Sequence, residues 1–392
     1  MHIACAWHPV LGQWVFAELY GLAFGMTSAV VAFNRVPAFI SAVGRRWLGL
    51  PTINYFDDVR LCGPADNAER IWRNFNWLTQ KLGWLFDKAK DSPMEVVGPF
   101  LGIVEDFTFL HGRECAGDGF VRLQPKPAFV EKLVTAISTA LESGQLYPGD
   151  ARSLQGKLLH FSNCIEGRVA RGQTFAFREF LELGVAELPT SLRRNLEFHL
   201  QLIDLRPWRT ITTTYGMRPR FTIYTDASFD LEHGVRLCFV VLSDSFQTAG
   251  ISSFTMAILN SMEDKETYIA HGEAFAPLLC LHWLGEKLRG SNILWFLDNL
   301  GIVSCLCKGS STVADVGCII HAFLLKSAAL GIQSWYEHVD SKANISDGGT
   351  RGDAIVLGMP FIQYPMPQWP RNTLQAGPST WFKWFSEYRY SS

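Results

Sequence analysis

The stretch FTIYTDAS, residues 221–228, decides the fold of the C-terminal half of this 392-residue chain. Residues 221–226 are rich in apolar and β-prone side chains, which predicts a strand that ends in Asp226. Further strands are expected at 235–243, 248–255, 293–297 and 333–339, and helices at 266–288 and 313–330. Three strands followed by alternating helices and strands predict a mixed α/β sheet.

Four acidic residues fall at particular places in this pattern. Asp226 lies inside an apolar strand, where a carboxylate is costly unless it is paired or binds a cation. Glu273 lies among apolar residues of the first expected helix, Asp298 directly follows a strand, and Asp347 follows the last strand. Carboxylates that converge there can hold two Mg²⁺ ions, with Mn²⁺ as the alternative, because oxygen ligands suit these cations. Two such ions can support hydrolysis of a phosphodiester.

The order of these acids resembles the RNase H family in its retroelement versions. The similar segments are YTDAS (224–228), HGEAFAPLLCLHWL (271–284), LWFLDNLGIVSCLCKGSS (294–311) and WYEHVDSKANISDGGTR (335–351). The last one departs from the family's N-x-A-D-x-x-S-R ending at Ser346 and Thr350. The resemblance implies that the four acids are catalytic metal ligands, and it suggests three auxiliary residues: His338, Asn299 and Asn344.

A second acidic motif lies near the N-terminus. Residues 53–61 place β-prone side chains on both sides of Asp57 and Asp58, which predicts a hairpin with the acidic pair near its turn. The segment YFDD (55–58) resembles the Y-x-D-D motif of reverse transcriptases. This resemblance implies that both acids are catalytic and that Asp57 also binds a metal.

Four more segments extend the likeness to reverse transcriptases: FGMTSA (24–29), LGWLFDKAK (82–90), FLG (100–102) and LQGKL (154–158). In the first, Ala23 and Val30 replace the family's prolines. The resemblance implies that nucleotide or nucleic acid is contacted by Phe24, Gly25, Ser28, Lys90, Leu101, Gly102 and Lys157.

One departure affects the expected polymerase activity. The family has another metal-binding Asp some tens of residues before its F-G segment, but only 23 residues precede Phe24 here and none is Asp. We therefore expect a truncated polymerase domain that is inactive alone. A complementing chain that supplies the fingers is a further possibility with no direct support in the sequence.

The expected parts are a partial reverse-transcriptase palm (1–112), a helical thumb or connection with a linker (113–219), an RNase H-like domain (220–353) and an irregular C-terminal tail (354–392). The expected fold class of the chain is α/β. It combines an α+β palm remnant with its hairpin, a helical segment, and a mixed sheet with flanking helices. The run 210–214 is expected to lie in the linker.

The composition sets limits on partners and compartment. A net charge of −2 argues mildly against nucleic-acid binding, although residues 120–219 hold 13 Lys and Arg against 9 acids. Nine cysteines without zinc-ligand spacing predict no zinc site and a reduced intracellular protein, in the cytoplasm or nucleus. There is no secretory signal, and the apolar stretch 21–43 is interrupted at Asn34, Arg35 and Pro37, so no membrane span is expected.

Three functions compete at this point. The leading hypothesis is an Mg²⁺-dependent endonuclease that cleaves the RNA of RNA–DNA hybrids. The alternative is a catalytically dead retroelement remnant that binds nucleic acid through its basic middle region and aromatic surface. The third is full reverse transcription with the help of another chain.

Overall fold

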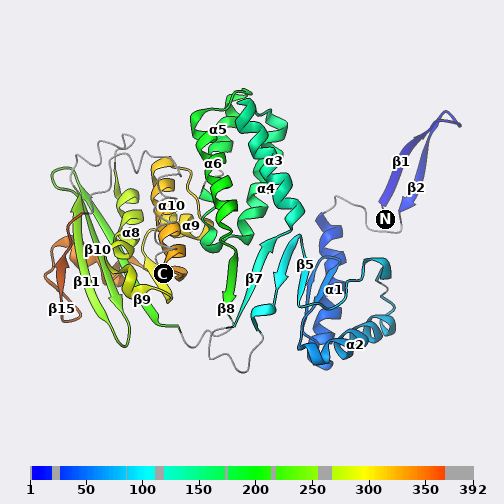
Figure 1. The fold of residues 1–392 in the computed structure, drawn as a ribbon, viewed down its shortest axis with the longest axis horizontal. Coiled ribbons are helices and arrows are strands. Elements are labelled where there is room, and N and C mark those ends of the chain that lie inside the picture. Colours follow the sequence, from blue (N-terminus) through cyan, green and yellow to red (C-terminus); the bar gives the residue numbers. More distant parts are fainter. Residues whose placement is uncertain are drawn as a thin grey trace. The chain divides into compact units, whose positions relative to one another are not determined.

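The computed structural model describes residues 2–19, 27–84, 86–110, 119–172, 175–212, 218–254 and 267–366. The chain divides into two compact units, residues 1–100 and 101–392. Helices and strands alternate in both, so the expected mixed α/β class is confirmed (Figure 1). The three expected domain boundaries stay predictions.

The first unit combines two hairpins with two helices. Strands β1 (His2–His8) and β2 (Gln13–Leu19) form one antiparallel hairpin, and β3 (Thr52–Tyr55) and β4 (Asp58–Leu61) form the other. Helices α1 (Thr27–Trp47) and α2 (Ala68–Lys81) and strand β5 (Val97–Phe100) complete the unit. A small apolar core joins α1 to α2: Ile40, Leu50, Ile71, Phe75 and Leu78.

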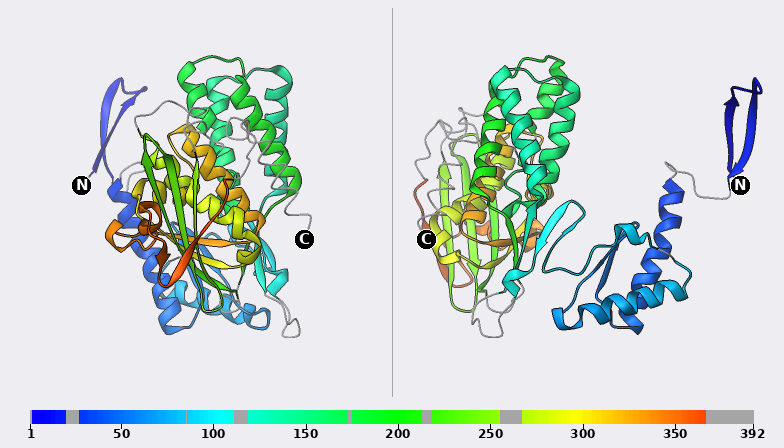
Figure 2. Two further views of the ribbon diagram at one scale, coloured as in Figure 1. Left: turned by 90° about the vertical axis from the view of Figure 1, so that its left-hand side faces the viewer. Right: turned by 45° about the vertical axis from the view of Figure 1, so that its right-hand side comes forward.

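The second unit begins with a small sheet and four helices. Strands β6 (Ile103–Asp106), β7 (Phe120–Pro125) and β8 (Arg209–Thr212) pair antiparallel. Between β7 and β8, α3 (Pro127–Ser143), α4 (Pro148–Phe161), α5 (Phe175–Leu183) and α6 (Thr190–Leu205) form the green bundle of Figure 2. The expected linker at 210–214 is wrong in part, because residues 210–212 belong to β8 and pair with β7.

A seven-stranded sheet follows, in the order β13-β12-β9-β10-β11-β15-β14. Strands β9 (Arg220–Asp230), β10 (Gly234–Leu242) and β11 (Gln247–Phe254) are antiparallel neighbours. Strand β12 (Asn292–Leu297) runs parallel to both β9 and β13 (Gln333–His338). The C-terminal end of β12, Leu297, therefore lies beside Thr225 in the middle of β9.

Four helices belong to this sheet: α8 (Ile269–Leu288), α9 (Leu300–Lys308), α10 (Ala314–Ala329) and the short α11 (Asp347–Arg351). Helix α8 packs on β9 and β10 and against α10 (Figure 1). One apolar core runs from the four-helix bundle into this layer, where the rings of Phe198 and His321 are 5.2 Å apart. Among the described residues, no helix has both the length and the apolar character that a membrane span requires.

The segment after α11 differs from the irregular tail expected from residue 354. Strands β14 (Ile355–Val356) and β15 (Met359–Gln363) form an antiparallel pair, and β15 also pairs in parallel with β11. Phe361 and Met359 pack with Cys238 and Val240 on the sheet face opposite α8. Residues 367–392 lie outside the described residues.

Candidate metal centre

Asp226 is held deep in the centre of the seven-stranded sheet. It lies on β9, pairs with Cys238 on β10, and is only 4% exposed. The hydroxyl of Thr350 donates a 2.5 Å hydrogen bond to its Oδ2. This contact fixes one carboxylate oxygen and leaves Oδ1 for another partner.

Glu273 reaches the same place from helix α8. The preceding residue, Gly272, allows the helix to come close to the sheet, because a Cβ there would lie 2.7 Å from Val235 Cγ1 and 2.8 Å from Ala227 Cβ. Glu273 is 3% exposed, and its Oε2 is buried without a hydrogen-bond partner among the described residues. A buried unpaired carboxylate oxygen is costly in a finished fold, which indicates that the site accepts a cation or a proton.

Asp298 completes a group of three carboxylates. It follows Leu297, which is in register with Thr225, so Asp298 lies beside Asp226 at the end of the neighbouring parallel strand. Asp226, Glu273 and Asp298 each have one carboxylate oxygen that lies within 4.8 Å of the corresponding oxygens of the other two. This is the spacing that a shared divalent cation needs.

The fourth predicted ligand, Asp347, lies at the rim of the same pocket. Its carboxylate accepts hydrogen bonds from Arg351 Nε, at 2.8 and 2.9 Å, within α11. The pocket has a volume of about 720 Å³ and is lined chiefly by polar residues and the four acids: Asp226, Ser228, Glu273, Asp298, Asn299, Ser341, Asp347, Thr350 and Arg351. Asp347 is therefore near the three-acid group but engaged with an arginine.

The electrostatics of the pocket favour neutral acids when no cation is bound. Burial, together with the smaller effect of the nearby charges of Asp298 and Asp226, raises the pKa of Glu273 to about 9. Burial also raises the pKa of Asp226 to about 6, against the lowering effect of the Thr350 hydrogen bond. A divalent cation would reverse both effects by stabilising the ionised carboxylates.

The three predicted auxiliary residues have different positions. Asn299 lines the pocket, and its side-chain oxygen caps α9 by accepting from Ile302 N at 3.2 Å. Asn344 is buried and donates to Thr225 O at 3.1 Å, so it ties the last loop to β9. His338 is exposed at the end of β13, and its Nε2 donates to the backbone carbonyl of Asp298 at 3.1 Å.

The two predicted catalytic acids of the first unit, Asp57 and Asp58, lie in the β3–β4 hairpin. Tyr55 pairs with Asp58, so Phe56 and Asp57 are the two turn residues, and a φ of 53° at Phe56 is typical of a type II′ turn. Asp57 and Asp58 are exposed, and neither belongs to the three-acid group, which is the one possible metal-ligand cluster in the described part of the chain.

The other predicted nucleotide contacts are dispersed. Ser28 is exposed in the first turn of α1, and Lys90 ends a short 3₁₀ helix. Leu101 and Gly102 have φ values of 50° and 81° and begin the second unit, and Lys157 is exposed on α4. Phe24 and Gly25 lie outside the described residues.

Among the lining residues that sequence reasoning missed, three make hydrogen bonds that hold the acids or their neighbours in place. Thr350 holds Asp226, Ser228 Oγ donates to Thr350 O at 3.3 Å, and Arg351 pairs with Asp347. Spacing along the helix could have found the Asp347–Arg351 pair, which is four residues apart. The Thr350–Asp226 contact spans 124 positions and has no such local signal.

No family model and no curated protein matches the sequence. Among solved structures, the chain is similar to RNase H1 from Halobacterium salinarum, at 15% identity and a TM-score of 0.25, over 32% of this chain and 89% of that one. It is also similar to LC11-RNase H1 in complex with an RNA/DNA hybrid, at 14% identity and a TM-score of 0.24, over 36% of this chain and 95% of that one. The foamy viral protease-reverse transcriptase in complex with dsDNA matches at 12% identity and a TM-score of 0.38, over 80% of this chain and 59% of the viral one. With TM-scores this low, function is inferred from the site itself.

Proposed function

We propose that this chain is the reverse transcriptase and RNase H portion of a retroelement, and that the Asp226 pocket cleaves the RNA strand of RNA–DNA hybrids endonucleolytically with Mg²⁺. The observation that carries the proposal is the group Asp226, Glu273 and Asp298, in which one carboxylate oxygen of each residue lies within 4.8 Å of the others. The Oε2 of Glu273 is also buried without a hydrogen-bond partner among the described residues. The ordered sequence motifs on both units support the retroelement origin.

The donor set fits a hard divalent cation. All its atoms are carboxylate oxygens, which suit Mg²⁺ and Mn²⁺ and not the softer metals that prefer sulfur or imidazole. Asp226, Glu273 and Asp298 would hold the metal, with Asp347 available at the rim. Magnesium bound there supplies activation of water and neutralisation of charge on the phosphodiester.

The residues around the acids have separate tasks. Thr350 orients Asp226, and Asn299 fixes the start of α9 directly after Asp298. Ser341 and Asn299 line the pocket with groups that can hydrogen bond to sugar hydroxyls. Since the 2′-hydroxyls of an A-form-like strand lie along an accessible minor groove, such groups favour RNA as the cleaved strand.

Hybrid cleavage by the full chain tests the proposal. A labelled RNA–DNA hybrid is incubated with the wild type, with Asp298→Asn, and with Asp244→Asn as a matched control, in Mg²⁺ or in EDTA. Asp244 is exposed in the turn between β10 and β11 and does not line the pocket. We expect Mg²⁺-dependent cutting of the RNA strand by the wild type and the control, and loss of cutting in Asp298→Asn.

Two results would count against it. Equal cutting by Asp298→Asn would place the activity elsewhere. Hybrid binding without cutting by a folded wild-type chain would favour the alternative, a catalytically dead remnant. Polymerase activity of the isolated chain is tested separately by primer extension, which we expect to be absent.

A further inference from the structure

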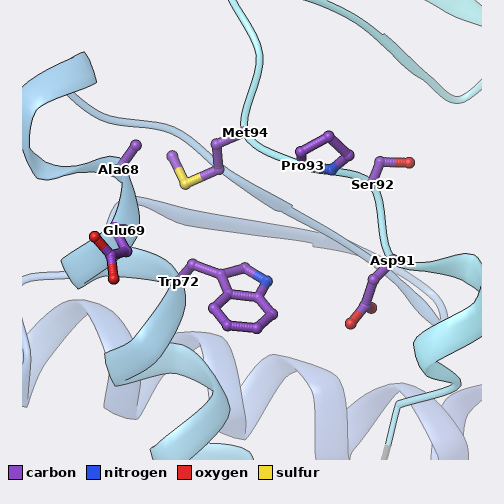
Figure 3. A pocket seen from close by; sticks show the side chains of 7 residues that line it. All are labelled: Ala68, Glu69, Trp72, Asp91, Ser92, Pro93 and Met94. Carbon is purple, nitrogen blue, oxygen red and sulfur yellow. The ribbon is translucent and has the colours of Figure 1, made fainter.

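The first unit contains a second pocket, of about 390 Å³, at the start of helix α2. Its lining residues come from two segments, the first turns of α2 and the chain leading to β5: Ala68, Glu69, Trp72, Asp91, Ser92, Pro93 and Met94 (Figure 3). Trp72 is 43% exposed, whereas the neighbouring Ile71 is 7% exposed and buried in the core. The indole therefore lines an open pocket and does not serve as core packing.

The ionisable side chains that line this pocket are all acidic. Glu69 and Asp91 are its ionisable lining residues, and Figure 3 shows their carboxylates on either side of the Trp72 ring. Glu69 also lies 3.7 Å from Arg73 on its own helix, but both side chains of that pair are highly exposed. Such a solvent-screened pair contributes little to stability, so a competing cation can displace it at small cost.

An aromatic face between two carboxylates selects a cation. The indole attracts a positive group above its ring through its quadrupole, and the carboxylates add hydrogen-bond acceptors for N–H donors. Pro93 and the thioether of Met94 supply apolar walls for an alkyl stem. A nucleic-acid phosphate would be repelled by the same two acids, so this pocket has a different ligand from the Asp226 site.

We propose that the Trp72 pocket binds an arginine side chain presented by a protein partner. A planar guanidinium can stack on the indole and donate to carboxylates at its edges at the same time, which a lysine ammonium cannot do. The inference stands on the pocket alone and is independent of the nuclease.

The test is ¹⁹F NMR on the full chain labelled with 5-fluorotryptophan. The chain has 13 tryptophans, and the Trp72 resonance is assigned by its loss in Trp72→Phe. The probe is an acetyl-Gly-Arg-Gly-amide peptide, and the same peptide with citrulline in place of arginine is a neutral isostere. Trp77, on the same helix and 53% exposed, provides an internal control.

We expect a saturable shift of the Trp72 resonance with the arginine peptide and no shift of Trp77. The citrulline peptide should bind roughly tenfold more weakly, because it loses both the cation–π contact and the charge-assisted hydrogen bonds to the carboxylates. The double variant Glu69→Gln, Asp91→Asn should weaken binding similarly while the other resonances stay in place. Equal shifts with both peptides, no saturation up to about 10 mM, or a Trp72 shift with a short RNA would overturn the proposal.

Discussion

Replacing Asp226 by Asn should make the metal-free protein more stable at pH 8, although it should abolish cleavage. Asp226 is almost fully buried, and its pKa is raised from 3.8 to about 6. Because the folded state holds this proton more tightly than the unfolded state, the stabilisation is complete below pH 3.8 and is lost as the pH rises through 6. Asparagine has nearly the same shape, stays neutral, and can still accept from Thr350.

The magnitude follows from the pKa difference. At about 1.36 kcal/mol per pH unit, the rise to about 6 corresponds to roughly 3 kcal/mol of stability lost on ionisation. For a unit that spans residues 101–392, that is a difference in Tm of roughly 5 °C. Mg²⁺ should reverse the order, because a cation at about 1,000 times its Kd adds about 4.1 kcal/mol to the wild type and much less to the variant.

The assay is urea unfolding of the full chain at pH 4, 6 and 8, in EDTA and in Mg²⁺, with Asp244→Asn as the exposed control. In EDTA, the advantage of Asp226→Asn over the wild type should grow from pH 4 to pH 8, while Asp244→Asn shows no such trend. An Asp226→Asn chain that is less stable than the wild type at pH 8 in EDTA would refute the reasoning, because it would mean that the buried carboxylate is already compensated.

Three further outcomes are expected. Thr350→Val should weaken Mg²⁺ affinity by about tenfold or more, while Thr350→Ser keeps it, because only the hydroxyl holds Asp226; titration calorimetry measures this. Gly272→Ala should cost roughly 1–3 kcal/mol in urea unfolding and reduce cleavage, since its Cβ would push α8 away from the sheet. His199 and His321 are buried with pKa values lowered to about 4 and about 3, so these two side chains should contribute a loss of about 4 kcal/mol between pH 7 and pH 5 as the unfolded chain gains protons, opposed by proton binding at Asp226 and Glu273 in the folded state. His321→Leu should remove about half of that loss in the same unfolding assay, and an unchanged loss would contradict the assignment.

The central part of the sheet was well predicted because its sequence signals are local. Alternation and apolar runs predicted β9, β10 and β12, and Asp226 and Asp298 were expected to converge at strand ends. The expected end of the first strand at Asp226 was wrong, because β9 continues to Asp230, and the two acids meet because Leu297 is in register with Thr225. Glu273 was placed on the correct helix. The catalytic roles of these residues stay predictions until cleavage is measured.

What the sequence did not predict depends on contacts between distant residues. Helix α9 was missed because its start is set by the Asn299 cap, and an Asp-Asn pair after a strand is also typical of a turn. Strand β8 was taken for a linker because four residues of Arg, Thr and Ile gain their structure only from pairing with β7. The close approach at Gly272 depends on side chains from two other strands and has no signature in its own segment.

Strand β15 has a consequence for how the protein can be shortened. It covers β11 along Ala249, Gly250 and Ile251, and Gly250 has no room for a Cβ beneath Tyr364 and Phe239. A chain cut at 353, the boundary suggested by the sequence, would leave β11 paired with β10 on one side and unpaired on the other, where β15 now meets Ala249, Gly250 and Ile251. Such an uncovered strand recruits strands from other molecules. The shortened protein should therefore self-associate in a concentration-dependent way, whereas a chain that extends to 366 should remain dispersed.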